Sequence, residues 1–314
     1  MSAPIYRDPV TDGATDPVII EGPAGEWRML YTQRRPGAPE PGVGWVHGSA
    51  IGTAVSRDGG ASWQYAGVLD GLSEQLGAAG LGAGIHTLWA PAIVRDAGTY
   101  HLFVTAIAGV PTSWHGHART IERFTSTDLN TWHHEGRVPL PSDLVIDAAV
   151  ARCPDGRWRL WCKDEAAGST TAVAVSDDLV DWSPEGVAID GQPHEGPVAF
   201  ALGGWWWMLT DEWRGLRVHR SSDARSWSPR GLVLAAAGEH ADDRQVARHA
   251  DVVVRGDAAF VVYFTHPAWD GSEIAEVDAG DVELQRSAIH VARAVVVDDD
   301  LLVERNVPAR LPLA

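Results

Sequence analysis

Short apolar runs separated by turn-forming residues recur along the whole chain. The runs come in pairs, and Gly, Pro or Asp separates the members of each pair. Runs of this length, bounded by turn residues, predict β-strands joined as hairpins rather than helices. The paired runs occupy residues 16–20 and 27–31, 91–94 and 100–104, 147–151 and 158–161, 197–200 and 205–209, and 251–254 and 259–264.

A Ser-x-Asp turn followed by a Trp ends four of these units. Ser and Asp side chains can close such a turn by accepting hydrogen bonds from nearby backbone N–H groups, and the Trp then packs beneath it. The fifth unit lacks the turn and continues with an apolar run at residues 288–292. The four copies begin at Ser56, Ser126, Ser176 and Ser221 and end at Trp63, Trp132, Trp182 and Trp227.

Five units in register predict an all-β fold, a five-bladed β-propeller. The alternative is a β-sandwich or a two-domain all-β protein, but the repeated order of strand, hairpin, strand and turn favours the propeller. No linker of biased composition interrupts the repeats, so we predict a single domain over residues 1–314. The predicted blades span approximately residues 14–70, 86–140, 145–190, 194–235 and 247–306.

The amino-acid composition limits the classes of molecule that the protein is expected to bind. The 15 Trp residues, against 5 Phe and 5 Tyr, suit blade cores and stacking on flat ligands such as sugars. The formal net charge of −17 disfavours nucleic acid and anionic membrane surfaces as partners. No run of 18 apolar residues is present, so no membrane-spanning helix is expected.

Two cysteines, Cys153 and Cys162, flank a Pro-Asp-Gly turn. If that turn closes a hairpin, the two residues lie several rungs apart, beyond the reach of a disulfide. We therefore expect two free thiols and a reducing compartment. The first ten residues show neither a basic nor an apolar signal region, which adds to the expectation of a cytoplasmic protein.

Polar residues mark the starts of the predicted first strands. In a propeller these strands line the central channel, and their starts share a face with the loops that join strands two and three. Three carboxylates from three blades therefore converge on one mouth, although any one of them alone could serve a turn or a strand cap. The residues at these starts are Asp16, Trp89, Asp147, Glu195 and His249 with Asp251.

Four of these starts resemble the blade-opening motifs of glycoside hydrolase family 43, in that family's order and over the whole chain. The motifs are Thr15-Asp16-Pro17, Trp89-Ala90-Pro91, Ile146-Asp147-Ala148 and Glu195-Gly196-Pro197. The resemblance implies a five-bladed propeller that hydrolyses glycosidic bonds with inversion. The Trp-Met-Asn-Asp-Pro motif usual in family 32 is replaced by Gly13-Ala14-Thr15-Asp16-Pro17, which disfavours a fructosidase.

By that resemblance Asp16 is the general base, Glu195 the general acid, and Asp147 the residue that tunes and orients the acid. His249 matches a histidine that helps to hold a central cation, often Ca²⁺, so one structural metal ion is expected in the channel, and no organic cofactor. Residues 56–63 also resemble the Asp-box of sialidases. Those enzymes have six blades, so we interpret the motif as a folding element.

The loops between strands two and three are expected to supply the substrate-binding side chains. Two of them are long and carry aromatic residues, which favours a closed pocket and exo attack on a small oligosaccharide. Lys163-Asp164-Glu165 and Asp211-Glu212 lie on the same face and offer rival carboxylates, which we interpret as solvated loop charges. The predicted substrate-binding residues are Trp45, His47, Trp89, Trp114, His115, Trp213, Arg214 and His249.

Other functions stay open. A propeller lectin would stack sugars on its Trp residues without cleaving them, and a scaffold would bind proteins through its rim loops. Neither needs converging carboxylates, whereas hydrolysis needs a raised-pKa acid and an ionised base. A glycoside phosphorylase would need a basic phosphate clamp, to which Arg214 and Arg248 could contribute. The sugar, the linkage and the oligomeric state are not determined by these patterns.

Overall fold

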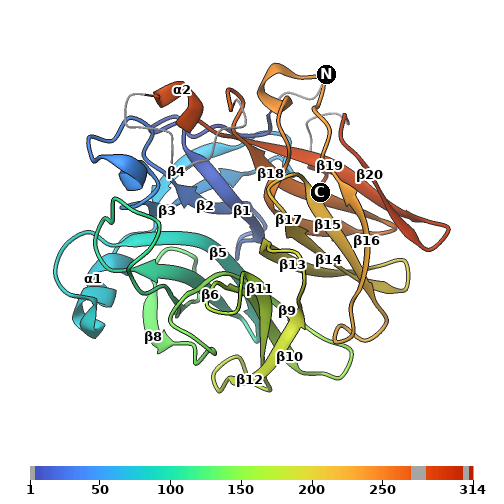
Figure 1. Ribbon diagram of the computed structural model, residues 1–314, viewed down its shortest axis with the longest axis horizontal. Coiled ribbons are helices and arrows are strands. Elements are labelled where there is room, and N and C mark those ends of the chain that lie inside the picture. Colours follow the sequence, from blue (N-terminus) through green and yellow to red (C-terminus); the bar gives the residue numbers. More distant parts are fainter. Residues whose placement is uncertain (1–3, 270–280, 307–310, 314) are drawn as a thin grey trace.

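Five antiparallel sheets of four strands each are arranged around a common centre in the computed structural model (Figure 1), which describes residues 4–269, 281–306 and 311–313. In every sheet the strands follow one another in sequence order, each paired with the next. The predicted five-bladed β-propeller is therefore confirmed. Many of the adjacent strands are joined by short turns, and the Gly and Asp residues of the chain suit such turns.

The strands have the following bounds. Blade one holds β1 (Ala14–Glu21), β2 (Trp27–Gln33), β3 (Ala50–Ser56) and β4 (Gln64–Val68). Blade two holds β5 (Thr87–Asp96), β6 (Thr99–Ile107), β7 (Thr120–Ser126) and β8 (His133–Arg137). Blade three holds β9 (Val145–Arg152), β10 (Trp158–Asp164), β11 (Thr170–Ser176) and β12 (Ser183–Ile189). Blade four holds β13 (Glu195–Leu202), β14 (Trp205–Asp211), β15 (Leu216–Ser221) and β16 (Ser228–Val233). Blade five holds β17 (Arg248–Arg255), β18 (Ala258–Thr265), β19 (Ala288–Val297) and β20 (Asp300–Glu304).

Helices are short and lie outside the sheets. The helix α1 (Leu72–Leu76) continues into a π-helical turn (Gly77–Leu81) between blades one and two, and α2 (Val282–Gln285) precedes β19. Single 3₁₀ turns cover Gly42–Trp45 and Ala241–Asp243. Within the described ranges, none of these helices is long and apolar enough to cross a membrane.

The inner strands β1, β5, β9, β13 and β17 contact one another in a ring, and the first and last blades meet to close it (Figure 1). Segments from both ends of the chain cross this junction. Tyr6 forms a β-bridge with Ile289 of β19, and the backbone N–H of Leu313 donates to the carbonyl of Gly59. Leu311 and Leu313 pack into the apolar cluster that joins blades one and five. The ring is thus closed by main-chain and apolar contacts from residues far apart in sequence.

The four predicted Ser-x-Asp turns are all present. In each, the Ser hydroxyl donates to the Asp carboxylate at 2.8–3.0 Å, as between Ser56 and Asp58. The same carboxylate accepts one or two backbone N–H groups of the turn, as Asp128 does from residues 130 and 131. Hydrogen bonds from the hydroxyl and the backbone N–H of Ser62, and from the Ser56 hydroxyl, lower the pKa of Asp58 to about 2. The turns therefore serve the fold and are not part of a site.

Cys153 and Cys162 are buried and free, as expected. Burial raises the pKa of both thiols. Cys162 packs with Trp158 and Trp182 in the core cluster that blade three shares with blade two. Both cysteines therefore act as small apolar residues of the core.

Candidate active site

Every inner strand is interrupted at the same place, near its start. A register shift occurs in the pairing of all five inner strands with their second strands, around residues 15–18, 89–92, 146–149, 195–198 and 248–250. Asp16, Ala90 and Asp147 adopt left-handed backbone conformations there, with φ of 50°, 45° and 61°, and Gly196 does so at 56°. Such conformations are costly for residues other than Gly, and they cluster at functional sites. The bulges aim residues of the predicted motifs at the mouth of the channel.

The backbone N–H groups freed by the bulges are satisfied by the preceding blade. The partners are side chains, so each link depends on residue type and ties two blades together at the channel mouth. The donor–acceptor pairs are Ala90 to Thr32 Oγ1 (2.7 Å), Asp147 to Thr105 Oγ1 (3.1 Å), Gly196 to Asp147 Oδ2 (3.0 Å) and His249 to Asp211 Oδ2 (3.1 Å).

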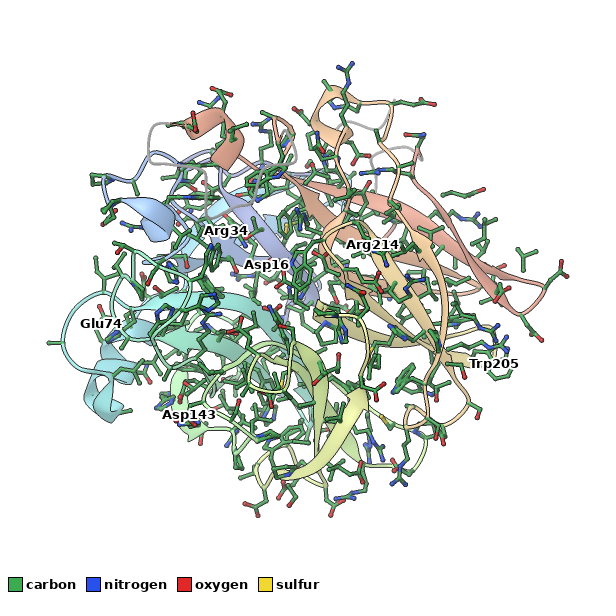
Figure 2. The ribbon with its side chains drawn as sticks, viewed as in Figure 1. Asp16, Arg34, Glu74, Asp143, Trp205 and Arg214 are labelled. Carbon is green, nitrogen blue, oxygen red and sulfur yellow. The ribbon has the colours of Figure 1, made fainter. Side chains whose placement is uncertain are left out.

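A cavity of about 660 Å³ opens at this mouth. Asp16, Trp89, Asp147, Glu195 and His249 all line it, so the structure brings together the predicted starts of the five blades. Figure 2 shows Asp16 close to the centre of the ring. Asp251 points the other way along the channel, where it lines a second cavity of about 200 Å³ and accepts a hydrogen bond from the N–H of Ile19 at 2.9 Å.

His249 lies between two of the carboxylates. Its Nδ1 atom is 3.7 Å from Oδ1 of Asp16 and 3.8 Å from Oδ2 of Asp147. Burial lowers the pKa of the imidazole, but Asp147 and Asp16 outweigh that effect and raise it. Burial raises the pKa of Asp147 to about 7, and the neighbouring Glu195 and Asp16 add to the rise against the opposing charge of His249. The three side chains form one electrostatic unit.

Glu195 is held by a cation instead. The Nζ atom of Lys163 donates to Oε2 of Glu195 at 3.0 Å. Although burial raises the pKa of Glu195, the charge and hydrogen bond of Lys163 and a hydrogen bond from Trp213 lower it below its usual value. The structure thus separates the two acids that sequence reasoning paired: Asp147 favours the protonated form and Glu195 the charged form.

The position of Lys163 follows from the repeat. It occupies on the second strand of blade three the place that Thr32 and Thr105 hold in blades one and two. Asp211 holds that place in blade four and is also buried, with a pKa raised by burial to about 6. The equivalent residues, opposite the start of each inner strand, are Thr32, Thr105, Lys163, Asp211 and Phe264.

The interpretation of Lys163, Asp164, Asp211 and Glu212 as solvated loop charges is wrong, because all four are buried. Glu212 accepts hydrogen bonds from Arg214 and Arg217, and its pKa is lowered by them despite burial. Glu165 is half-buried, lines the cavity and accepts from Arg119 at 2.6 Å. Placement near the ends of second strands, which the repeat predicts, was the signal for their burial.

Most predicted substrate-binding residues reach the cavity. Trp89, Trp114, His115, Trp213, Arg214 and His249 line it, and Trp269 of the fifth blade joins them. Trp89 and Trp114 lie with ring centroids 6.2 Å apart and form one aromatic wall. Trp213, 38% exposed, lies opposite Lys163, whose Nζ is 5.2 Å from the ring centroid.

Trp45 and His47 do not reach it. The loop that carries them folds back as a 3₁₀ turn, so both side chains are fully buried behind the wall. The His47 ring packs 4.8 Å from Trp89 and its Nδ1 bonds the carbonyl of Val43 at 3.0 Å. Burial lowers the pKa of His47 to about 4, so it is neutral. These two residues support the wall rather than line it.

The described residues hold no group of three or more His, Cys, Asp or Glu side chains arranged to bind a metal ion. His249, the predicted metal ligand, has its Nδ1 atom directed at Asp16 and Asp147, and they favour its protonated form, which cannot bind a metal. The side chains present therefore do not fit the expected channel cation, and we derive no step through one.

Several cavity-lining residues were not among the predicted site residues. They share no sequence motif, and most lie at the end of a second strand, directly after one, or in the segment before β17. They are Arg34, Val46, Arg119, Ile146, Lys163, Glu165, Gln245, Val246, Arg248, Phe264 and His266.

No protein-family model matches the sequence, and no curated protein matches it. Solved structures are similar over the whole chain. A thermostable family 43 glycoside hydrolase has a TM-score of 0.69 and 18% identity, with 97% of each chain covered. A family 43 β-xylosidase/α-arabinofuranosidase from a compost microbial metagenome, in complex with xylotriose and in a calcium-free form, has a TM-score of 0.69 and 14% identity over 97% of this chain and 98% of that one. An exo-1,5-α-L-arabinanase from a bovine ruminal metagenomic library has a TM-score of 0.63 and 14% identity, covering 96% and 100%.

At these identities the likeness shows the fold. The chain has the five-bladed propeller of family 43 glycoside hydrolases, as the blade-opening motifs implied. The sugars named for the neighbours are properties of those proteins.

Proposed function

We propose that this protein is a glycoside hydrolase that acts on a small oligosaccharide. One observation carries the proposal: carboxylates from β1, β9 and β13 and an imidazole from β17 line a single cavity at the channel mouth. A purely structural channel does not need charged side chains at these positions. Hydrolysis of an acetal does need two carboxyl groups with different tasks. The family 43 fold of the neighbours supports the same activity.

In the proposed mechanism Asp16 is the general base. Its carboxylate accepts a hydrogen bond from the Thr15 hydroxyl at 3.0 Å and lies beside Arg34 and His249. These contacts orient it towards the cavity, where it would take a proton from the attacking water. The stereochemical outcome that goes with this role is inversion at the anomeric carbon.

Glu195 is the proposed general acid. Its side chain is 25% exposed to the cavity, against 8% for Asp147, so it is better placed to meet the oxygen of the leaving group. Asp147 and Glu195 are electrostatically coupled, because the charge of Glu195 raises the pKa of Asp147, and an ionised Asp147 would in turn raise the pKa of Glu195. Lys163 opposes protonation of Glu195. The proposed activity therefore falls as pH rises through the pKa of Glu195, because a general acid must carry its proton.

The aromatic walls support exo action. Trp89, Trp114, Trp213 and Trp269 line the cavity, and the less buried Trp114 and Trp213 offer faces on which sugar rings can stack. A pocket walled in this way admits a chain end more readily than the middle of a polymer. The free, buried cysteines support the further proposal of a reducing compartment.

A panel of aryl glycosides, pentofuranosides and uronides included, tests this function. We expect release of the aryl alcohol by the wild type and a loss of about 100-fold or more in Asp16→Asn and Glu195→Gln. Proton NMR of the first-formed sugar reports the anomer and hence inversion. Activity that survives both substitutions contradicts the assigned roles. Sugar binding without cleavage of any member would favour the lectin alternative.

A further inference from the structure

Cationic side chains are abundant in the cavity of this acidic protein. Five of them, with four carboxylates, line it, although the chain as a whole carries a net charge of −17. The positive charges that lack a carboxylate partner are not spread evenly around the cavity. The cavity-lining cations are Arg34, Arg119, Lys163, Arg214 and Arg248.

On the side formed by blades two to four, each cation has a carboxylate partner. Arg119 bonds Glu165 at 2.6 Å, Lys163 bonds Glu195, and Arg214 bonds Glu212 at 2.8 Å. These ion pairs balance the charge locally. A neutral sugar is the natural occupant of such a surface.

On the side formed by blades one and five, the two arginines are not balanced in this way. The Nη1 atom of Arg34 bonds Nε2 of His266 at 3.3 Å, while its nearest carboxylate oxygen, on Asp16, is 3.9 Å from Nη2. Burial lowers the pKa of His266 to about 3, helped by the charge of Arg34. His266 therefore holds Arg34 as a neutral acceptor, and its Nδ1 atom faces the carbonyl of Arg286 at 2.9 Å.

Arg248 has fewer polar contacts than Arg34. Among the described residues its guanidinium makes no hydrogen bond and no ion pair within 4 Å, although its charge reaches Glu195 and Asp211. Arg34 and Arg248 both lie near Phe264. Phe264 pairs with Arg248 in the β17–β18 ladder, and the Arg34 guanidinium lies 5.5 Å from the Phe264 ring centroid. The charges of both arginines also lower the pKa of His266. Figure 2 shows Arg34 beside Asp16, with Arg214 across the centre.

We infer that Arg34 and Arg248 form an oxyanion subsite at this end of the cavity, and that the substrate carries a negatively charged group there, such as the carboxylate of a uronic acid. The planar guanidinium groups offer several N–H donors in the geometry that carboxylate and phosphate oxygens accept. A partly desolvated cation without a close anionic partner is costly, and an incoming anion removes that cost. The claim that the bound anion belongs to a substrate rests on the proposed function, whereas the anion-binding subsite itself does not.

Binding measurements test the subsite without any need for catalysis. Isothermal titration would compare D-glucuronate with D-glucose, D-galacturonate with D-galactose, and inorganic phosphate with no ligand. We expect at least one uronate to bind about tenfold more tightly than its neutral counterpart, with a preference that weakens as ionic strength rises. Arg248→Gln should reduce the preference to less than twofold, and Arg34→Gln should weaken it.

Two further variants serve as controls for the binding measurements. Arg248→Lys keeps the charge and should retain part of the preference, since Lys lacks the bidentate fork. Arg293→Gln makes the same change in net charge on β19, where Arg293 is 42% exposed and pairs with Glu304 at 3.5 Å, and should leave the preference unchanged. Equal binding of charged and neutral sugars, no binding of uronate or phosphate, or a preference that survives both Arg248→Gln and Arg34→Gln would overturn the inference.

The titration with inorganic phosphate distinguishes a charged group on the sugar from a separate phosphate ion as the ligand of the subsite. If phosphate competes with uronate, and if glycoside cleavage requires phosphate and yields a sugar 1-phosphate, the subsite stands and serves a co-substrate. In that reaction a phosphate oxygen bonds to the anomeric carbon, the bond to the leaving oxygen breaks, and that oxygen takes the proton of Glu195. Arg248-dependent uronate binding without any cleavage would support the subsite and contradict the proposed hydrolase function. Equal hydrolysis of neutral glycosides and uronides would support the hydrolase function and contradict the subsite.

Discussion

Lys163 and Glu195 form an ion pair inside the cavity, with Nζ and Oε2 3.0 Å apart, and Lys163 also lies 3.4 Å from Glu165. The pair connects the second strand of blade three with the first strand of blade four. It places the proposed general acid under the control of a residue that stands at a Thr position in two other blades. The strength of this control can be measured.

Removal of the Lys163 charge should move the pH dependence of catalysis. The proposed acid must be protonated, so kcat/KM falls as pH rises through its pKa in the free enzyme. Lys163 lowers that pKa, while burial raises it. In Lys163→Met burial remains and the cation is lost, so the basic limb of the kcat/KM profile should shift to higher pH. Lys163→Arg keeps the charge and serves as the control; an unshifted limb in Lys163→Met would exclude Glu195 as the acid.

A side chain at position 196 should disturb the site through His249. Gly196 has φ of 56°, and a Cβ atom there would lie 2.7 Å from Cγ of His249. We expect Gly196→Ala to destabilise the fold by roughly 1–3 kcal/mol and to lower activity, because the His249 ring must move. Gly256 has φ of 60° with no atom within 4 Å of the added Cβ, so Gly256→Ala isolates the backbone cost. Denaturant unfolding of both variants measures the difference, and equal losses would contradict the clash.

Substitutions of Trp45 and Trp213 should separate an effect on folding stability from an effect on substrate binding. Trp45 is fully buried in the cluster behind the wall, whereas Trp213 is exposed to the cavity. Trp45→Ala should cost about 3–5 kcal/mol in the free energy of unfolding. Trp213→Ala should raise KM with little effect on unfolding. A large KM effect of Trp45→Phe at unchanged stability would restore Trp45 as a substrate contact.

Acid should destabilise the protein in part through His219. Burial lowers the pKa of this side chain to about 4, and its Nε2 lies 3.1 Å from the Thr210 hydroxyl. The unfolded chain, with a histidine pKa of about 6.5, binds more protons between pH 6.5 and 4, so stability falls as pH falls through that window. The loss from this residue is on the order of 2–3 kcal/mol. Unfolding curves of the wild type and His219→Gln across that window measure it; parallel pH dependences would contradict the assignment.

Much of the fold was predictable because the repeat is local. Paired apolar runs and Ser-x-Asp turns recur in the sequence, and each encodes its hairpin or turn through contacts within one unit. Asp16, Asp147 and Glu195 were predictable as cavity residues for a related reason: in a propeller the start of each inner strand always faces the channel. The positions of Trp114, His115, Trp213 and Arg214 on the cavity followed from the same geometry.

The rest was decided by packing between blades. Trp45 and His47 lie in a loop, and no local pattern says that the loop folds back to bury them. Lys163 and Glu195 are 32 residues apart, and only the ring brings the ammonium to the carboxylate. The same holds for Arg34 and Arg248, which come from the first and last blades and line the same cavity near Phe264. The sequence by itself determined which elements form and which residues start each blade, because those depend on near neighbours. The tertiary structure alone decided which charges face one another, because electrostatic energies depend on distances and burial that arise when five blades close into a ring.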